Sequence, residues 1–163
     1  MPVTIESIAD YPHLVPTIAH WHWHEWGYCD PAGSLESWTV GLQERTFKDE
    51  IPTTYIALDD HLPVGSVTLV AHDMDTYTDL SPWLAGLYVI PTYRRRGIGS
   101  MLVQNAIQTT AKLGIPKLYL YTHTADSLYR RLGWQAIGNE YYEGQFVTMM
   151  VFHTHSAIQQ FTN

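Results

Sequence analysis

The feature that most constrains this chain is a strand, a basic turn and a helix that follow one another without interruption. Residues 84–90 form an apolar run with β-branched and aromatic members, and Pro91 ends it, which predicts a buried strand. After the turn, apolar residues recur at helical spacing over residues 98–113 and stop at Gly114, which predicts a helix. This order places the turn at the N-terminus of a helix.

The turn itself can hold an anion. Backbone N–H groups in the first turn of a helix lack intrahelical partners and lie at the positive end of the helix dipole. Gly97 and Gly99 have no Cβ, so phosphate oxygens can approach the main chain closely, and three arginines, residues 94–96, supply positive charge. The competing interpretation is a solvated basic surface turn, but the strand before it and the helix after it favour anion binding. Neither G-x-x-x-x-G-K-[ST] nor G-x-G-x-x-G is present, which argues against a P-loop or a dinucleotide-binding Rossmann site.

Length and composition indicate a globular protein of one domain. The chain has 163 residues, 45% of them hydrophobic and 15% charged, and we expect one domain over residues 1–155 with a frayed tail at 156–163. No apolar run reaches the length of about 18 residues that a membrane span requires, and the N-terminus does not resemble a signal peptide. Together with the single Cys29, this predicts a cytoplasmic protein without a membrane contact.

Charge is distributed unevenly along the chain. The formal net charge of −7 argues against general nucleic-acid binding. Residues 1–93 carry 13 acidic and 2 basic side chains, whereas residues 94–163 carry 3 acidic and 7 basic ones. One interpretation is that the C-terminal half receives a polyanion while the N-terminal half presents acid to a cationic acceptor, and chance surface composition is the alternative for the acidic half.

A cluster of aromatic and histidine residues lies in a predicted helix at residues 12–26. His20 and His24 are four residues apart and could share a ligand, but no third ligand and no H-E-x-x-H motif are present, so we predict no metal site. Trp23, Glu25 and Trp26 are instead predicted to pack the helix and line an acceptor pocket.

The remaining pattern predicts further strands and helices around this unit. A second helix is predicted from Leu35 to about Leu42, after Ser34, and a short one lies within residues 124–134 and ends at Gly133. The strand at 117–122 follows the helix after the turn, so it and the strand at 84–90 form a strand–helix–strand unit with parallel strands. Other strands are predicted near residues 3–8, 53–58, 64–70, 135–141 and 145–152.

Two motifs resemble a known family. The order Arg94-x-x-Gly97-x-Gly99 resembles the pyrophosphate-binding motif of the GNAT superfamily of acyl-CoA-dependent N-acetyltransferases. Residues 128–134, Leu-Tyr-Arg-Arg-Leu-Gly-Trp, resemble the second signature of that family, Leu-Tyr-x-x-x-Gly-Phe. The segment Thr122-His123-Thr124 departs from the family, because it lacks the Asn that many members carry there. The resemblance implies a mixed α/β (α+β) fold: a mostly antiparallel central sheet of about seven strands, four helices, and a parallel pair at 84–90 and 117–122 that splays apart.

The resemblance also implies an activity and a cofactor site. We expect an N-acetyltransferase in which the primary amine of a small molecule or of a protein N-terminus attacks acetyl-CoA directly. Tyr129 would act as the general acid for the leaving thiolate, although a core aromatic side chain is its alternative role. Arg94 would open the pyrophosphate motif, while Arg95 and Arg96 would contribute backbone amides and diffuse charge. The residues expected to bind acetyl-CoA are Leu87, Tyr88, Val89, Arg94, Arg95, Arg96, Gly97, Ile98, Gly99 and Ser100.

The general base and the acceptor stay open at this level. The candidate bases are Glu25, His22, His24, His72 and His123, and we take His123 first because it follows the strand at 117–122. The acceptor is a small amine or a peptide, and a homodimer is neither required nor excluded. The alternative function is a non-catalytic acyl-CoA-binding or sensing module on the same fold.

Overall fold

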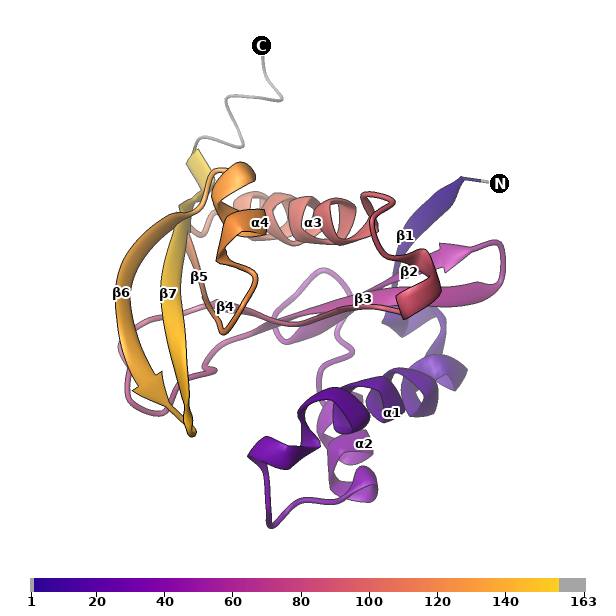
Figure 1. Ribbon diagram of the computed structural model, residues 1–163. Helices are drawn as coiled ribbons and strands as arrows, with labels where there is room; N and C mark the ends of the chain where they lie inside the picture. Colours follow the sequence, from indigo (N-terminus) through magenta and orange to yellow (C-terminus); the bar gives the residue numbers. More distant parts are fainter. Residues whose placement is uncertain (1, 156–163) are drawn as a thin grey trace.

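The computed structural model describes residues 2–155, which form a seven-stranded sheet with helices on both faces (Figure 1). The predicted tail at residues 156–163 lies outside the described residues. The strands have the order β1-β2-β3-β4-β5-β7-β6, and all neighbours are antiparallel except β4 and β5. The strands are β1 (Val3–Ser7), β2 (Thr53–Asp59), β3 (Leu62–Val70), β4 (Trp83–Val89), β5 (Lys117–Thr122), β6 (Gln135–Tyr142) and β7 (Gln145–His153). The α-helices are α1 (Val15–Trp26), α2 (Leu35–Gln43), α3 (Ile98–Lys112) and α4 (Asp126–Arg131). The predicted fold class is therefore confirmed.

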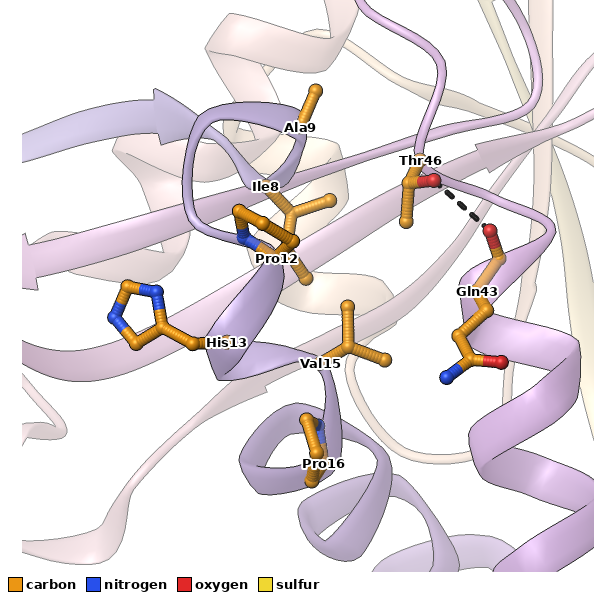
Figure 2. A pocket seen from close by; sticks show the side chains of 8 residues that line it. All are labelled: Ile8, Ala9, Pro12, His13, Val15, Pro16, Gln43 and Thr46. Carbon is orange, nitrogen blue, oxygen red and sulfur yellow. Dashed lines mark hydrogen bonds between the residues drawn. The ribbon is translucent and has the colours of Figure 1, made fainter.

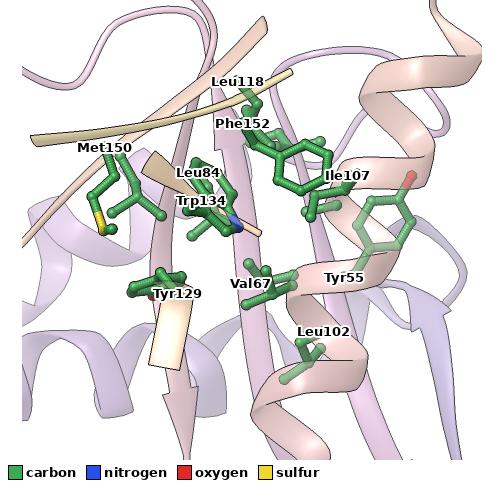
Figure 3. Packing of buried hydrophobic residues seen from close by; sticks show 14 of the residues in the cluster. Tyr55, Val67, Leu84, Leu102, Ile107, Leu118, Tyr129, Trp134, Met150 and Phe152 are labelled. Carbon is green, nitrogen blue, oxygen red and sulfur yellow. The ribbon is translucent and has the colours of Figure 1, made fainter. Parts of the chain in front are cut away.

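The larger core lies between the sheet and the layer of α3 and α4 (Figures 1 and 3). The apolar face that the sequence predicts for α3 is the face that packs on the strands. Its buried side chains meet those of β3, β4 and β5, which alternate toward this layer. These buried α3 side chains are Ile98, Leu102, Val103, Ala106 and Ile107. Burial of each Val, Leu or Ile side chain among them stabilises the fold by about 1.5–3 kcal/mol.

The second core lies on the opposite face, where α1 and α2 cover β2 and the turn that follows β1 (Figure 1). Ile18 of α1 and Ile56 of β2 are both fully buried there. The helix predicted from residue 12 begins only at Val15, after a 3₁₀ turn at Pro12–Leu14. Pro16 explains this difference, because proline lacks an N–H and is tolerated in a helix only in its first turn.

A β-bulge in β4 opens the sheet between β4 and β5. Ser66 of β3 pairs with Tyr88 and Thr68 pairs with Ala85, so two residues of β4, Gly86 and Leu87, lie opposite a single residue of β3. Trp83 opposite Tyr119 is the only registered pair between β4 and β5 among the described residues. The two parallel strands therefore separate toward their carboxyl ends, beside the basic turn.

Candidate active site

The turn between β4 and α3 has the geometry of an anion site. Gly97 is the N-cap of α3 with φ +80°, and no side chain caps the helix. A Cβ built on Gly97 or on Gly99 would meet no atom within 4 Å, chain neighbours aside, so the turn is open at both glycines. An α-helix of 15 residues with free N–H groups at an open glycine turn fits a pyrophosphate, because the amides and the helix dipole both favour negative charge.

The three arginines differ in their roles within the turn. Arg94 donates from Nε to the carbonyl oxygen of Val89 at 2.8 Å, and its guanidinium lies 5.5 Å from the centre of the Tyr88 ring. Arg96 stacks in a similar way on Tyr93 at 4.7 Å. Arg95 has φ +65°, a left-handed conformation that turns the chain into α3. Arg94 therefore ties the turn to the end of β4, and all three side chains are exposed on its surface.

Tyr129 lies in α4, on the side of the sheet that α3 also covers. The side chain is buried and packs edge-on against Trp134, with ring centres 5.8 Å apart (Figure 3). Burial raises the pKa of its phenol far above the usual value, so the hydroxyl stays protonated at neutral pH. Within residues 2–155, its hydroxyl has no hydrogen-bond partner. A protonated O–H without a partner is available to a bound ligand.

His123, the first candidate base, lies one residue beyond the end of β5. The imidazole is exposed, and its Nδ1 is 3.1 Å from the carbonyl oxygen of Phe146. A carbonyl only accepts, so Nδ1–H is the donor and the neutral ring presents the lone pair of Nε2 to its surroundings.

The residues predicted to bind the acceptor do not lie together. Trp26 contacts Tyr88 of β4, with ring centres 6.3 Å apart, and so borders the bulge. Trp23 instead packs edge-on against Trp38 of α2 at 5.7 Å. Glu25 is exposed on α1. Residues 23 and 26 are three apart and are neighbours on the surface of α1, so their different partners are set by what packs against each ring, whereas residue 25 lies on the other side of the helix from residue 23.

A half-buried carboxylate, Asp73, was missed in the sequence analysis. Burial raises its pKa from 3.8 to about 6, although the charge of Arg45 lowers it in part. The charges of Asp73 and Glu143 both raise the pKa of the Tyr121 phenol. Tyr121 lies near the divergent end of β5. An acidic residue in a polar loop carries no sequence signal for this position, because only the fold brings it to β5.

Aromatic side chains accompany this carboxylate. Tyr121 packs edge-on against Trp83 of β4 and against Tyr142 of β6, at centre distances of 6.3 and 5.4 Å. Beside them, the amide of Gln145 donates to the Tyr28 hydroxyl at 2.9 Å, which joins the loop after α1 to the β6–β7 hairpin. The resulting cluster is acidic and aromatic, and it lies on the α1 side of the β4–β5 opening.

No metal site is found in the described part of the chain. Groups of three or more His, Cys, Asp or Glu side chains that could hold a metal ion are absent from residues 2–155. His20 and His24 stack with ring centres 6.3 Å apart. No helix within the same range is both long enough and apolar enough to cross a membrane.

A hollow of about 370 Å³ borders the turn and is lined in part by Arg96 and Ile98. Hollows also occur elsewhere. One, of about 310 Å³, is formed where the first turn of α1 meets the end of α2, and Figure 2 shows Ile8, Pro12, Val15 and Gln43 around it. None of the predicted site residues lines it. We assign it no part in the chemistry, because its lining is mostly apolar and it is separated from the turn by the sheet.

Comparisons with known proteins agree with this geometry. A family model described as "Acetyltransferase (GNAT) family" matches residues 15–134. No curated protein sequence matches the chain significantly.

Several solved structures share the fold. An aminoglycoside 6'-N-acetyltransferase complexed with coenzyme A superposes with a TM-score of 0.74 at 18% identity, covering 94% of this chain and 97% of that one. A chimera of the spermidine N-acetyltransferase SpeG from Vibrio cholerae and hSSAT gives 0.70 at 16% identity, covering 97% and 99%. Arabidopsis thaliana NAA60 in complex with acetyl-CoA gives 0.69 at 15% identity, covering 93% and 98%. At these identities the likeness establishes the fold.

Proposed function

Because the chain belongs to the acetyltransferase (GNAT) family, we propose that it transfers an acetyl group from acetyl-CoA to the primary amine of a small molecule or of a protein N-terminus. The observation that carries this proposal is the opening between β4 and β5, which leads to an uncapped glycine turn at one end and to an acidic, aromatic cluster on the α1 side. Similar structures bound to coenzyme A or acetyl-CoA support the donor.

Different residues of the chain bind the cofactor and transfer the protons of the reaction. First-turn amides of α3 and the arginines bind the pyrophosphate, and β4 holds the pantetheine along its separated edge. The amine nitrogen attacks the thioester carbon, the C–S bond breaks, and Tyr129 gives its proton to the departing thiolate. The proton lost by the amine passes to Asp73, directly or through water. His123 is the competing acceptor of that proton.

The charge near the opening favours a cationic acceptor. Asp73 and Glu143 both act on Tyr121, and 13 of the 16 acidic residues lie within residues 1–93. Aminoglycosides and spermidine, which the similar enzymes named above act on, carry several amino groups. A polyamine-like amine is therefore the first acceptor class to test, ahead of a peptide N-terminus.

Turnover with a panel of amines tests the proposal. We expect acetyl-CoA to bind and to stabilise the folded state by about 2.7 kcal/mol at a hundredfold excess over Kd. The melting temperature should rise accordingly. Free thiol should then appear in the presence of polyamines, aminoglycosides or peptides. Binding without thiol release for any amine would favour the acyl-CoA-binding module, and no binding at all would contradict both functions.

Replacing Asp73 by Asn should separate the two candidate bases. We expect kcat/KM at pH 7.5 to fall by about 10²-fold or more, because removal of a general base typically costs 10²–10⁴. The wild-type rate should decline as pH falls below about 6, and this decline should be absent in Asp73→Asn. Asp79→Asn, on the same loop but exposed, is the matched control and should retain full activity. If His123→Gln abolishes this decline and Asp73→Asn does not, the base is His123.

The same substitution has a predicted effect on stability. A carboxyl whose folded pKa is raised binds more protons in the native than in the unfolded state between pH 3.8 and about 6, so its contribution to stability is lost as pH rises through that range. Asp73→Asn should therefore increase the free energy of unfolding above pH 6, by about 1–3 kcal/mol. Chemical denaturation at pH 5 and 8 measures this, and a gain equal at both values would contradict it.

A further inference from the structure

A buried histidine of α1 reaches the bulge of β4. His22 is 7% exposed, and its Nε2 lies 2.8 Å from the hydroxyl oxygen of Ser66 on β3. The Ser66 hydroxyl in turn lies 3.1 Å from the carbonyl oxygen of Gly86, inside the bulge. Three elements are therefore joined by one chain of hydrogen bonds, although none of these residues is part of the two sequence motifs.

The chemistry of the acceptors determines the direction of this chain. The Gly86 carbonyl can only accept, so Ser66 donates to it and accepts from His22. Nε2 of His22 therefore carries a proton and donates it to the Ser66 hydroxyl. Burial, with a smaller effect of the Arg45 charge, lowers the pKa of His22 to about 4, which keeps the ring neutral at the pH of the cell. A group with so low a pKa is a weak base, so His22 is better suited to hold a hydrogen bond than to accept the amine proton.

The bulge is also shaped to the histidine. Gly86 has φ +60°, which a residue with a side chain adopts only at a cost. A Cβ on Gly86 would lie 3.2 Å from Cε1 of His22, so the two are in close contact. Trp26 covers the imidazole on the other side, with ring centres 5.3 Å apart. The ring is thus held by packing as well as by hydrogen bonding.

We propose that His22 and Ser66 position the N–H of Leu87 as the donor to the thioester carbonyl. In a trans peptide the C=O of one residue and the N–H of the next point in opposite directions. The Gly86 carbonyl is anchored toward β3, so the Leu87 N–H points away from β3, toward the side on which β5 has separated. That N–H is then oriented before the acetyl group arrives, and it donates to the oxygen on which negative charge develops. His22 and Ser66 are positioning residues, and the inference rests on the proposed acetyl transfer.

Two substitutions at one position test the proposal. His22→Leu keeps an apolar side chain of moderate volume but removes the donor, whereas His22→Gln keeps an N–H donor at a similar distance from the backbone. We expect His22→Leu to lower kcat by about 10- to 100-fold, less than the 10²–10³ of a fully removed oxyanion donor, with Kd for acetyl-CoA within about threefold of wild type. His22→Gln should restore most of kcat. Ser66→Ala should resemble His22→Leu, because it breaks the same chain.

A spectroscopic measurement separates orientation from general damage. With acetyl-CoA labelled with carbon-13 at the carbonyl, binding to the wild type should shift the thioester resonance downfield, since a hydrogen bond polarises the carbonyl. The downfield shift should shrink in His22→Leu and return in His22→Gln. The melting temperatures of these variants should not rank in the same order as their shifts. An unchanged carbonyl resonance and unchanged kcat in His22→Leu would overturn the proposal. If the wild type binds acetyl-CoA with the downfield shift but acetylates no amine, the proposed function fails while the positioning role stands.

Discussion

Tyr129→Phe should reduce kcat by about 10²- to 10³-fold and leave the Kd for acetyl-CoA unchanged. The phenol is buried and its pKa is raised by burial, so it carries a proton that it can give to the departing thiolate. Phe keeps the ring and its contact with Trp134, and it removes only the hydroxyl. Steady-state kinetics with a responsive amine and calorimetric titration of acetyl-CoA measure the two quantities.

Tyr55→Phe is the matched control for this prediction. Tyr55 is a second buried tyrosine in the same core, and its hydroxyl accepts a hydrogen bond from Thr109 at 2.9 Å. We expect Tyr55→Phe to lower stability by about 1 kcal/mol through the lost hydrogen bond and to leave kcat unchanged. Tyr129→Phe should cost little stability, since its hydroxyl has no partner in residues 2–155. Equal activity of wild type and Tyr129→Phe would assign Tyr129 to the core alone.

Gly97→Glu should raise the Kd for acetyl-CoA by at least about 100-fold. The substitution has two effects: it places a β-carbon at φ +80°, which costs about 1 kcal/mol, and it brings a carboxylate to the site of the pyrophosphate. Gly97→Ala introduces only the first effect, and its Cβ meets no atom within 4 Å. We therefore expect Gly97→Ala to weaken binding by no more than about tenfold.

The difference between these two variants isolates the charge at the turn. Arg94→Ala should also weaken binding, by losing both a positive charge and the hydrogen bond to Val89. Calorimetric titration with acetyl-CoA at low and high salt measures these effects, and the penalty of Gly97→Glu should shrink as salt screens the repulsion. If Gly97→Glu binds acetyl-CoA as tightly as Gly97→Ala does, the pyrophosphate does not lie at the N-terminus of α3.

Local patterns in the sequence predicted most of the fold. The apolar run before Pro91, the helical spacing after Gly97 and the glycine at residue 114 each act within a few residues, so strand, turn and helix could be recognised without knowing their neighbours. The fold class and the family, which rest on the spacing of two motifs, are confirmed. The single domain at 1–155 and the assigned roles of the site residues stay predictions.

Residues that act across elements were not predictable in the same way. In the sequence, His22 is one of several candidate bases, because nothing next to it reveals Ser66, 44 residues away, or the burial that lowers the pKa of His22 to about 4. Asp73 was missed for the same reason. Trp23 and Trp26 looked alike in the sequence, but one packs on α2 and the other borders β4.

The sequence by itself determined where the chain can bind an anion. A helix N-terminus with glycines is a local structure, and its amides and dipole favour phosphate wherever the helix is placed. Only the tertiary structure decided what lies around the opening beside that turn. The bulge at Gly86, the separation of β4 from β5 and the partners of His22 and Asp73 all depend on contacts between distant segments, because desolvation and hydrogen bonding are set by what packs against a residue, not by its neighbours in the chain.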